Sequence, residues 1–155
     1  MAVSVLFVCL GNICRSPLAE AALRREAEKL GAELEIDSAG TGDWHVGQPP
    51  DRRALAAARR NGIDISHLRA RQVTAHDFHR FDHIVALDRQ NLAALDRMRP
   101  DRARATLSLL LDHVEGREGE AVADPYYGES GQFDATWRDV ALGAAALARK
   151  IATTR

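Results

Sequence analysis

The stretch VCLGNICRSPLAE, residues 8–20, decides how this chain is expected to fold. Residues 3–8 lead into it as an almost continuous apolar and β-branched run, a pattern typical of a strand buried on both faces of a parallel sheet. Ser16 can cap a helix, Pro17 suits the first helical position, and apolar residues then recur at helical spacing until Gly31. The stretch therefore predicts a strand, a glycine-containing loop and a helix in immediate succession.

Strand and helix patterns alternate along the rest of the chain, with no internal repeat and no linker. Strands are expected at residues 33–37, 83–87 and 106–111, and helices at residues 51–61, 74–79 and 88–98, with residues 114–130 as a loop. A closing helix is expected to pack on the core through one stripe made of Phe133, Trp137, Val140, Ala144, Leu147 and Ile151. The alternation predicts a single α/β domain over residues 1–155, with a small doubly wound parallel sheet of about four strands and helices on both faces.

The charge balance argues against two classes of partner. The chain has 21 Lys plus Arg and 22 Asp plus Glu, a net charge of -1, which gives no electrostatic footprint for nucleic acid or an anionic membrane. The apolar start VSVLFVCL is too short to span a bilayer and lacks the basic region of a signal peptide. We therefore expect no nucleic-acid partner, no membrane insertion and a cytoplasmic location. The oligomeric state and export without a signal peptide stay open.

Both cysteines of the chain, Cys9 and Cys14, lie in the opening stretch. In a reducing compartment a structural disulfide is not expected, which leaves a redox pair, half of a metal site, or a loop built around one reactive thiolate. Gly11 permits a sharp turn and Asn12 tolerates a left-handed conformation, so backbone N–H groups can converge on an anion at the helix N-terminus. Arg15 adds a planar fork for two phosphate oxygens, and the same positive field favours the thiolate form of Cys9. These features predict a phosphate-binding loop directly after the first strand.

The extended string around this C-x5-R pattern resembles the signature of the low-molecular-weight protein tyrosine phosphatases. The similarity continues in order through DSAGTGDWHVGQPPD, GIDISHLRARQV, FDHIVALDRQNL and ADPYYGE, so it covers nearly the whole chain. The resemblance implies that Cys9 is the nucleophile, that Arg15 binds the phosphoryl oxygens, and that Asp124 is a general acid and then a base. It also implies a phosphocysteine intermediate, no metal, no cofactor, and phosphotyrosine-containing proteins as substrates.

Further roles follow from the same resemblance. Ser16 is expected to hydrogen-bond the thiolate, and Ser38 and His67 are expected to hold Asn12 in its strained conformation. Cys14 has two open interpretations, a partner of Cys9 in a reversible disulfide or a packed core residue, so it is placed in the loop and not among the catalytic groups. The remaining loop positions and the expected pocket walls are Leu10, Gly11, Ile13, Trp44, Tyr126 and Tyr127.

Two wall positions bear on the substrate. In the related protein-arginine phosphatases the position of Ile13 looks like a threonine, and the position of Tyr126 tends to be a phenylalanine. The residues present here, together with an aromatic slot that suits a flat phenyl phosphate, favour phosphotyrosine. Arsenate reduction is a competing activity, but related reductases need a further cysteine pair and no cysteine follows Cys14. A non-catalytic anion-binding module is disfavoured by the joint presence of nucleophile, arginine and acid.

Several of these residues also have simpler interpretations. Asp124 before Pro125 can initiate a turn, and Asp88 is most simply the cap of its helix. The spacing of His76, His79 and His83 could place imidazoles on one helical face as metal ligands. We expect no metal site there, because the predicted strand at residues 83–87 interrupts the helix before the third histidine.

Overall fold

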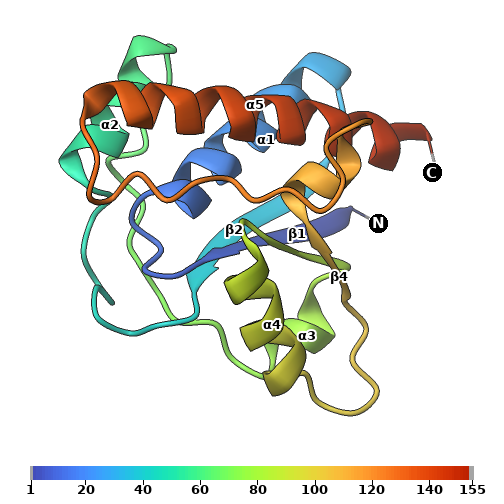
Figure 1. Cartoon of the computed structure of the whole chain (residues 1–155). Helices are drawn as coiled ribbons and strands as arrows, with labels where there is room; N and C mark the ends of the chain where they lie inside the picture. The colour runs from blue at the N-terminus through green and yellow to red at the C-terminus, as the bar shows by residue number, and fades with distance from the viewer. Residues whose placement is uncertain (1, 154–155) are drawn as a thin grey trace.

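A four-stranded, all-parallel sheet forms the centre of the computed structural model, which describes residues 2–153 (Figure 1). The strands are β1 (Val3–Cys9), β2 (Leu34–Gly40), β3 (His83–Ala86) and β4 (Thr106–Leu109), in the spatial order β2-β1-β3-β4. After β1 the chain forms β2 on one side of it and then β3 and β4 on the other side, which confirms the doubly wound sheet. The second strand runs further than predicted, and the fourth ends early in a short 3-10 helix, η1 (Leu110–His113).

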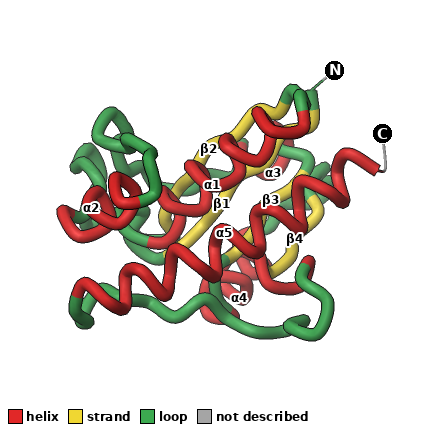
Figure 2. Tube along the Cα trace, turned by 90° about the horizontal axis from the view of Figure 1, so that it is seen from above, coloured by secondary structure: helices red, strands yellow, loops and turns green. Residues whose placement is uncertain are grey.

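Helices cover both faces of the sheet. The helices are α1 (Arg15–Leu30), α2 (Arg52–Arg60), α3 (Asp77–Arg80), α4 (Arg89–Met98) and α5 (Ser130–Thr153). Figure 1 shows α1, α2 and α5 on one face and α3 and α4 on the other, and the view from above in Figure 2 shows α1 and α5 side by side over the sheet. The predicted layers are therefore confirmed.

Alternate side chains of β1 point to opposite faces of the sheet and so contribute to two separate hydrophobic clusters. Val5 and Phe7 pack in the cluster shared with α1 and α5, whereas Leu6 and Val8 pack in the cluster that includes Phe78 and Leu95 of the opposite face. All four strand residues are fully buried, as expected for a central strand covered on both sides. On α5, the whole predicted stripe is buried: Phe133, Trp137, Val140, Ala144, Leu147 and Ile151.

Most helix ends follow the sequence signals, with one exception at α1. Asp51 and Asp88 accept backbone hydrogen bonds at the starts of α2 and α4, and Gly31 ends α1 with a left-handed φ of 62°. The prediction that Ser16 caps α1 is wrong, because the helix already begins at Arg15 and its cap position has no side-chain hydrogen bond. The Ser16 hydroxyl lies inside the loop instead.

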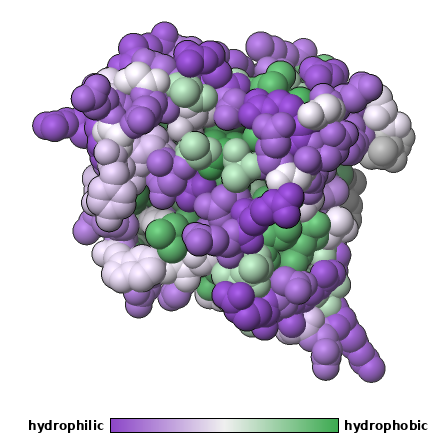
Figure 3. Space-filling model, in the orientation of Figure 1, coloured by the Kyte–Doolittle hydropathy of each residue, from purple (hydrophilic) through white to green (hydrophobic). Residues whose placement is uncertain are grey.

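Figure 3 shows that hydrophilic side chains cover most of the face seen there and that apolar side chains reach the surface in small patches. No helix within residues 2–153 combines the length and the apolar character needed to cross a membrane.

Candidate active site

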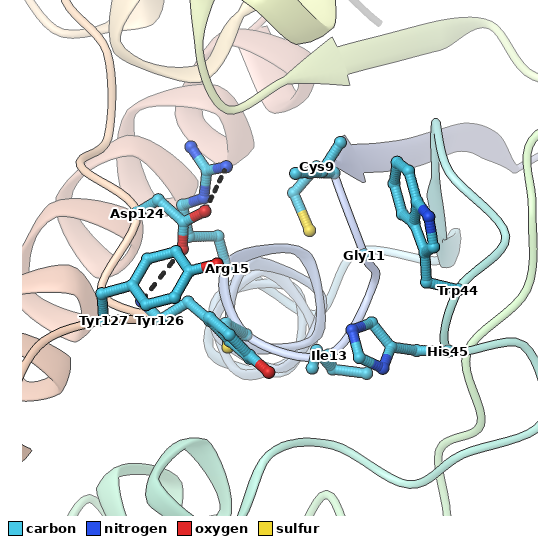
Figure 4. A pocket seen from close by; sticks show the side chains of 11 residues that line it. Cys9, Gly11, Ile13, Arg15, Trp44, His45, Asp124, Tyr126 and Tyr127 are labelled. Carbon is cyan, nitrogen blue, oxygen red and sulfur yellow. Dashed lines mark hydrogen bonds and ion pairs between the residues drawn. The ribbon is translucent and has the colours of Figure 1, made fainter.

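Cys9 is the last residue of β1, and its thiol points into the space between two loops (Figure 4). The side chain is almost fully buried, and its Sγ lies 3.0 Å from the Ser16 hydroxyl oxygen. Gly40, the β2 neighbour of Cys9, lets the loop pass close by, because a Cβ atom there would lie 2.8 Å from the Leu10 carbonyl oxygen. The sheet and the start of α1 thereby fix the Cys9 thiol between them.

Asn12 carries the strained backbone of the loop, with a φ of 57°. Its buried carboxamide donates to the hydroxyl oxygens of Ser16 at 2.8 Å and Ser38 at 2.9 Å, and its Oδ1 accepts from the backbone N–H of Arg71 at 3.0 Å. These three bonds offset the cost of the left-handed conformation, which an asparagine tolerates better than most residues. The roles that the resemblance implied for Ser16 and Ser38 agree with this geometry.

His67 does not take part in this network. It is exposed and lines a separate pocket beside α1, together with Arg25 and Asp64. The reason lies in the backbone: Arg71 and Val73 hydrogen-bond to Gly40 of β2, so this segment brings the N–H of Arg71 against Asn12. The expected support from His67 is therefore corrected to a backbone contact from Arg71.

Glu20 also supports the loop, because it hydrogen-bonds Ser38, which in turn contacts Asn12. Its buried carboxylate accepts from the Ser38 hydroxyl at 2.8 Å and from Arg24 at 2.9 Å. Burial raises the pKa of Glu20, and its hydrogen bonds with Ser38 and Arg24 act in the opposite direction. Sequence reasoning missed this residue. The only signal was a carboxylate between alanines on the buried side of α1.

Arg15 lies beneath the loop with a side chain that is 3% exposed. Its Nη1 donates to Asp88 Oδ2 at 2.7 Å and to the Val122 carbonyl oxygen at 2.9 Å, and its Nη2 lies 3.5 Å from Asp124 Oδ2. Asp88 is also the predicted helix cap, because its Oδ1 accepts from the backbone N–H of Asn91 at 2.7 Å. The Asp88 carboxylate thus both caps α4 and binds Arg15, and its contact with Arg15 was not predicted.

Asp124 reaches the pocket from the long loop before α5. Its side chain is 42% exposed, and its Oδ1 accepts from the backbone N–H of Tyr126 at 3.1 Å. The turn predicted from Asp124-Pro125 is therefore present, and it leaves Oδ2 facing Arg15. A carboxylate held in this way can exchange protons with a ligand above Cys9.

A pocket of about 310 Å³ surrounds these groups. Figure 4 shows Trp44 and His45 on one side of the Cys9 sulfur and Asp124, Tyr126 and Tyr127 on the other. The pocket lining contains the predicted loop and wall residues Leu10, Gly11, Ile13, Cys14, Trp44, Tyr126 and Tyr127. His45, whose ring centroid is 6.3 Å from that of Tyr126, was not predicted; its only sequence signal was its place beside Trp44.

Cys14 is a buried free thiol, as is Cys9. Burial, together with Asp51 and Cys9 nearby, raises the pKa of Cys14 well above its ordinary value. Cys14 is therefore held as a neutral thiol, which is a poor nucleophile. Within residues 2–153, no group of three or more His, Cys, Asp or Glu side chains is arranged as metal ligands.

A cysteine at the end of the first strand, a buried arginine at the start of the following helix and a carboxylate near that arginine meet in one pocket on a doubly wound sheet, the arrangement expected of a cysteine-dependent phosphatase. The model of the family described as low molecular weight phosphotyrosine protein phosphatase matches residues 4–155. The chain belongs to this family.

Individual relatives agree with this assignment. The low molecular weight phosphotyrosine protein phosphatase of Schizosaccharomyces pombe is 48% identical over 134 residues, covering 84% of this chain and 85% of the relative. The crystal structure of YfkJ from Bacillus subtilis, at 41% identity, covers 100% of this chain and 98% of that chain with a TM-score of 0.92. A Drosophila arginine phosphatase is also similar, with 32% identity, 95% and 96% coverage of the two chains and a TM-score of 0.89.

Proposed function

We propose that this chain is a protein tyrosine phosphatase that hydrolyses phosphotyrosine in proteins through a phosphocysteine intermediate on Cys9. The observation that supports this most strongly is the meeting of three groups in one pocket: the Cys9 thiol, the Arg15 guanidinium and the Asp124 carboxylate. Such a set supplies a nucleophile, a binder for the phosphoryl oxygens and a proton donor, which are the three requirements of a two-step displacement.

In the first step the Cys9 thiolate attacks phosphorus, so an S–P bond forms as the P–O bond to the tyrosine breaks. Ser16, 3.0 Å from the sulfur, can donate a hydrogen bond to the thiolate. Arg15 and the loop N–H groups at the start of α1 stabilise the charge on the equatorial oxygens. Positioning and electrostatics carry most of the catalysis in such transfers.

The leaving group needs a proton. The pKa of tyrosine is about 10, so the expulsion of a phenolate is assisted by a carboxylic acid, typically by about a hundredfold to ten-thousandfold. Asp124 donates this proton to the phenolic oxygen in our proposal. In the second step the same carboxylate accepts a proton from water, which attacks phosphorus, breaks the S–P bond and releases inorganic phosphate and the thiolate.

The pocket walls support an aryl phosphate as the substrate. Trp44 and Tyr126 flank the opening on opposite sides, so a phenyl ring can lie between them while its phosphate reaches Cys9 (Figure 4). Ile13 and Tyr126 occupy the two positions at which the protein-arginine phosphatases look different. Because an arginine phosphatase is among the similar structures, phosphoarginine is the alternative substrate to test.

The test compares three peptides of one sequence that carry phosphotyrosine, phosphoserine or phosphoarginine, with phosphate release as the readout. We expect turnover of the phosphotyrosine peptide and little of the other two. The variant Cys9→Ser should abolish turnover while inorganic phosphate still binds, because the oxyanion-binding groups remain. Turnover by Cys9→Ser would refute the mechanism, and a preference for phosphoarginine would refute the substrate class.

A further inference from the structure

We propose that Arg53 positions the general acid by fastening the loop that carries it to the phosphate-binding loop. We call residues 123–129, which contain Asp124, the acid loop. Arg53 lies in the first turn of α2 and does not line the pocket. The inference rests on the proposed role of Asp124 as the proton donor.

The Arg53 guanidinium holds the acid loop by two backbone carbonyl groups. Its Nη2 donates to the Tyr126 carbonyl oxygen at 2.8 Å, and its Nη1 donates to the Gly128 carbonyl oxygen at 2.8 Å. These carbonyls lie two and four residues after Asp124, on either side of Tyr127. A contact at two points fixes the orientation of the loop as well as its distance from α2.

The other edge of the guanidinium is bound to Asp51. Nε of Arg53 donates to Asp51 Oδ1 and Nη2 to Oδ2, both at 3.0 Å. Asp51 in turn donates its backbone N–H to the Ile13 carbonyl oxygen at 2.8 Å. Three hydrogen-bonded links in series therefore connect the phosphate-binding loop to the acid loop: Ile13 to Asp51, Asp51 to Arg53, and Arg53 to the acid loop.

Aromatic rings restrain the guanidinium further. Its central carbon is 4.6 Å from the ring centroid of Phe133, which is fully buried at the start of α5, and 5.8 Å from that of Tyr126. Cation–π contacts of this kind are worth about 0.5–1 kcal/mol at exposed sites and more when water is excluded. Four hydrogen bonds and two rings thus define a single orientation of Arg53.

The acid depends on this fastening because its own contacts are few. The Asp124 carboxylate has a hydrogen bond from within its own loop and a 3.5 Å contact with Arg15, and its side chain is 42% exposed. Misplacing a reacting group by about 1 Å can lower a rate roughly a hundredfold. A loosened acid loop would therefore impair proton donation first, and would leave the attack by Cys9 less affected.

Lysine cannot replace Arg53 in this role. A single ammonium cannot bind two carbonyl oxygens and both oxygens of Asp51 at once, and it lacks the planar face that lies against Phe133. The variant Arg53→Lys therefore keeps the charge and removes the geometry. Arg52→Lys makes the same exchange at the exposed neighbouring position of α2 and is the matched control.

The experiment measures kcat/KM, which reports the steps up to phosphocysteine formation, for two aryl phosphates. Phenyl phosphate has a poor leaving group that needs the acid, whereas 2,4-dinitrophenyl phosphate has a leaving group that departs with little protonation. For Arg53→Lys we expect a loss of about tenfold or more with phenyl phosphate and less than about threefold with the dinitrophenyl ester. Arg52→Lys should match the unmodified protein with both substrates.

A double-mutant cycle completes the test. With Asp124→Asn the proton donor is gone, so adding Arg53→Lys should produce no further loss with phenyl phosphate. Equal losses for the two esters, or additive losses in the double variant, would overturn the positioning role. Failure of the proposed function is distinguishable, because it would appear as turnover by Cys9→Ser, or as no effect of Asp124→Asn on phenyl phosphate hydrolysis in otherwise unmodified protein.

Discussion

Arg15 and Asp88 form an ion pair beneath the phosphate-binding loop, with Nη1 2.7 Å from Oδ2. The arginine side chain is 3% exposed and the aspartate side chain 20%. Because Asp88 and the Val122 carbonyl oxygen occupy Nη1, the guanidinium cannot rotate freely, and Nη2 is left towards the pocket and Asp124. If Arg15 binds the phosphoryl group as we propose, its guanidinium is thus oriented before a substrate arrives, which reduces the cost of ordering it in the transition state.

Replacing Asp88 by Asn is expected to weaken the binding of phosphate. Asparagine is as good a helix cap as aspartate, so the start of α4 is retained while the charge facing Arg15 is lost. Removing an oxyanion donor outright costs about 10²–10³ in rate, and a donor that is only released from its anchor should cost less. We expect kcat/KM for a phosphotyrosine peptide to fall by roughly tenfold, and the inhibition constant of inorganic phosphate to rise.

The control for this prediction is Asp96→Asn. Asp96 is an exposed residue of the same helix, so this change removes one negative charge without touching Arg15. It should alter neither constant by more than about twofold, as expected for a screened surface charge. Equal effects of the two substitutions would mean that only long-range charge matters and that the ion pair has no positioning role.

Cys14 should be unreactive towards alkylating reagents in the folded protein. Burial, Asp51 and Cys9 all raise its pKa, and only the thiolate form reacts. The variant Cys9→Ser leaves Cys14 as the single thiol, so its reaction with iodoacetamide at pH 7.5 can be followed by mass spectrometry. We expect modification at least about a hundredfold slower than in the same variant unfolded in guanidinium chloride, since each pKa unit removes about tenfold of the thiolate.

A fast reaction in the folded variant would contradict this assignment. The matched variant Cys14→Ser isolates Cys9 and reports the reactivity of the Cys9 thiol with the same reagent. Together, the two variants separate a reactive thiolate from a packed thiol only five residues further along the chain.

Much of the fold followed from local sequence signals. The apolar run before Cys9, the caps Asp51 and Asp88 and the glycine after α1 act over a few residues, so each could be recognised in isolation. The stripe of α5 repeated for long enough to show its buried face. These signals were sufficient for the doubly wound sheet.

The supports of the site could not be predicted in the same way. The contacts of Arg15 with Asp88 and of Asn12 with Arg71 join residues 73 and 59 positions apart, and no local pattern specifies them. Ser16 shows the limit most clearly. A serine before a proline is a good cap signal, yet the loop places its hydroxyl beside the sulfur of Cys9.

His113 should make the protein less stable in acid. Its Nε2 lies 2.9 Å from the Ser108 hydroxyl oxygen and its Nδ1 3.0 Å from Lys150 Nζ. Burial and Lys150, with a smaller contribution from His83, lower the pKa of His113 to about 4, against the attraction of Asp112. In the unfolded chain a histidine has a pKa near 6.5, so the unfolded state binds the proton more tightly than the folded state does. Protonation therefore favours unfolding, and the stability that neutral His113 contributes is lost as the pH falls from about 6.5 to about 4.

The comparison with His113→Gln isolates this contribution, because a glutamine amide can still reach Ser108 but does not titrate. The free energy of unfolding, measured with urea between pH 4 and pH 7.5, should fall more steeply for the unmodified protein than for the variant. The difference should be on the order of 2 kcal/mol, allowing for solvent screening of a partly exposed ring. Parallel curves would show that His113 titrates alike in the folded and unfolded chains.

Gly143 should be required in the middle of α5, although alanine is the better helix former. Replacing glycine by alanine in a helix interior normally stabilises by about 0.5–1 kcal/mol. A Cβ atom at this position would lie 2.5 Å from Cγ of Leu110, which is fully buried in η1, and overpacking of this kind costs about 1–3 kcal/mol. The steric term is the larger one, so Gly143→Ala should lower the free energy of unfolding, measured with urea, by about 1 kcal/mol.

Two further variants decide whether this contact is the cause. Gly131 lies in the same helix with nothing within 4 Å of a Cβ atom, so Gly131→Ala should leave stability unchanged or raise it. In a Leu110→Ala background the clash is removed, and Gly143→Ala should then become stabilising, because only the helix preference remains. If Gly143→Ala destabilises both backgrounds equally, the cost does not arise from Leu110. If Gly143→Ala stabilises the unmodified protein, α5 and η1 pack less tightly there than the 2.5 Å distance between the added Cβ and Leu110 Cγ implies.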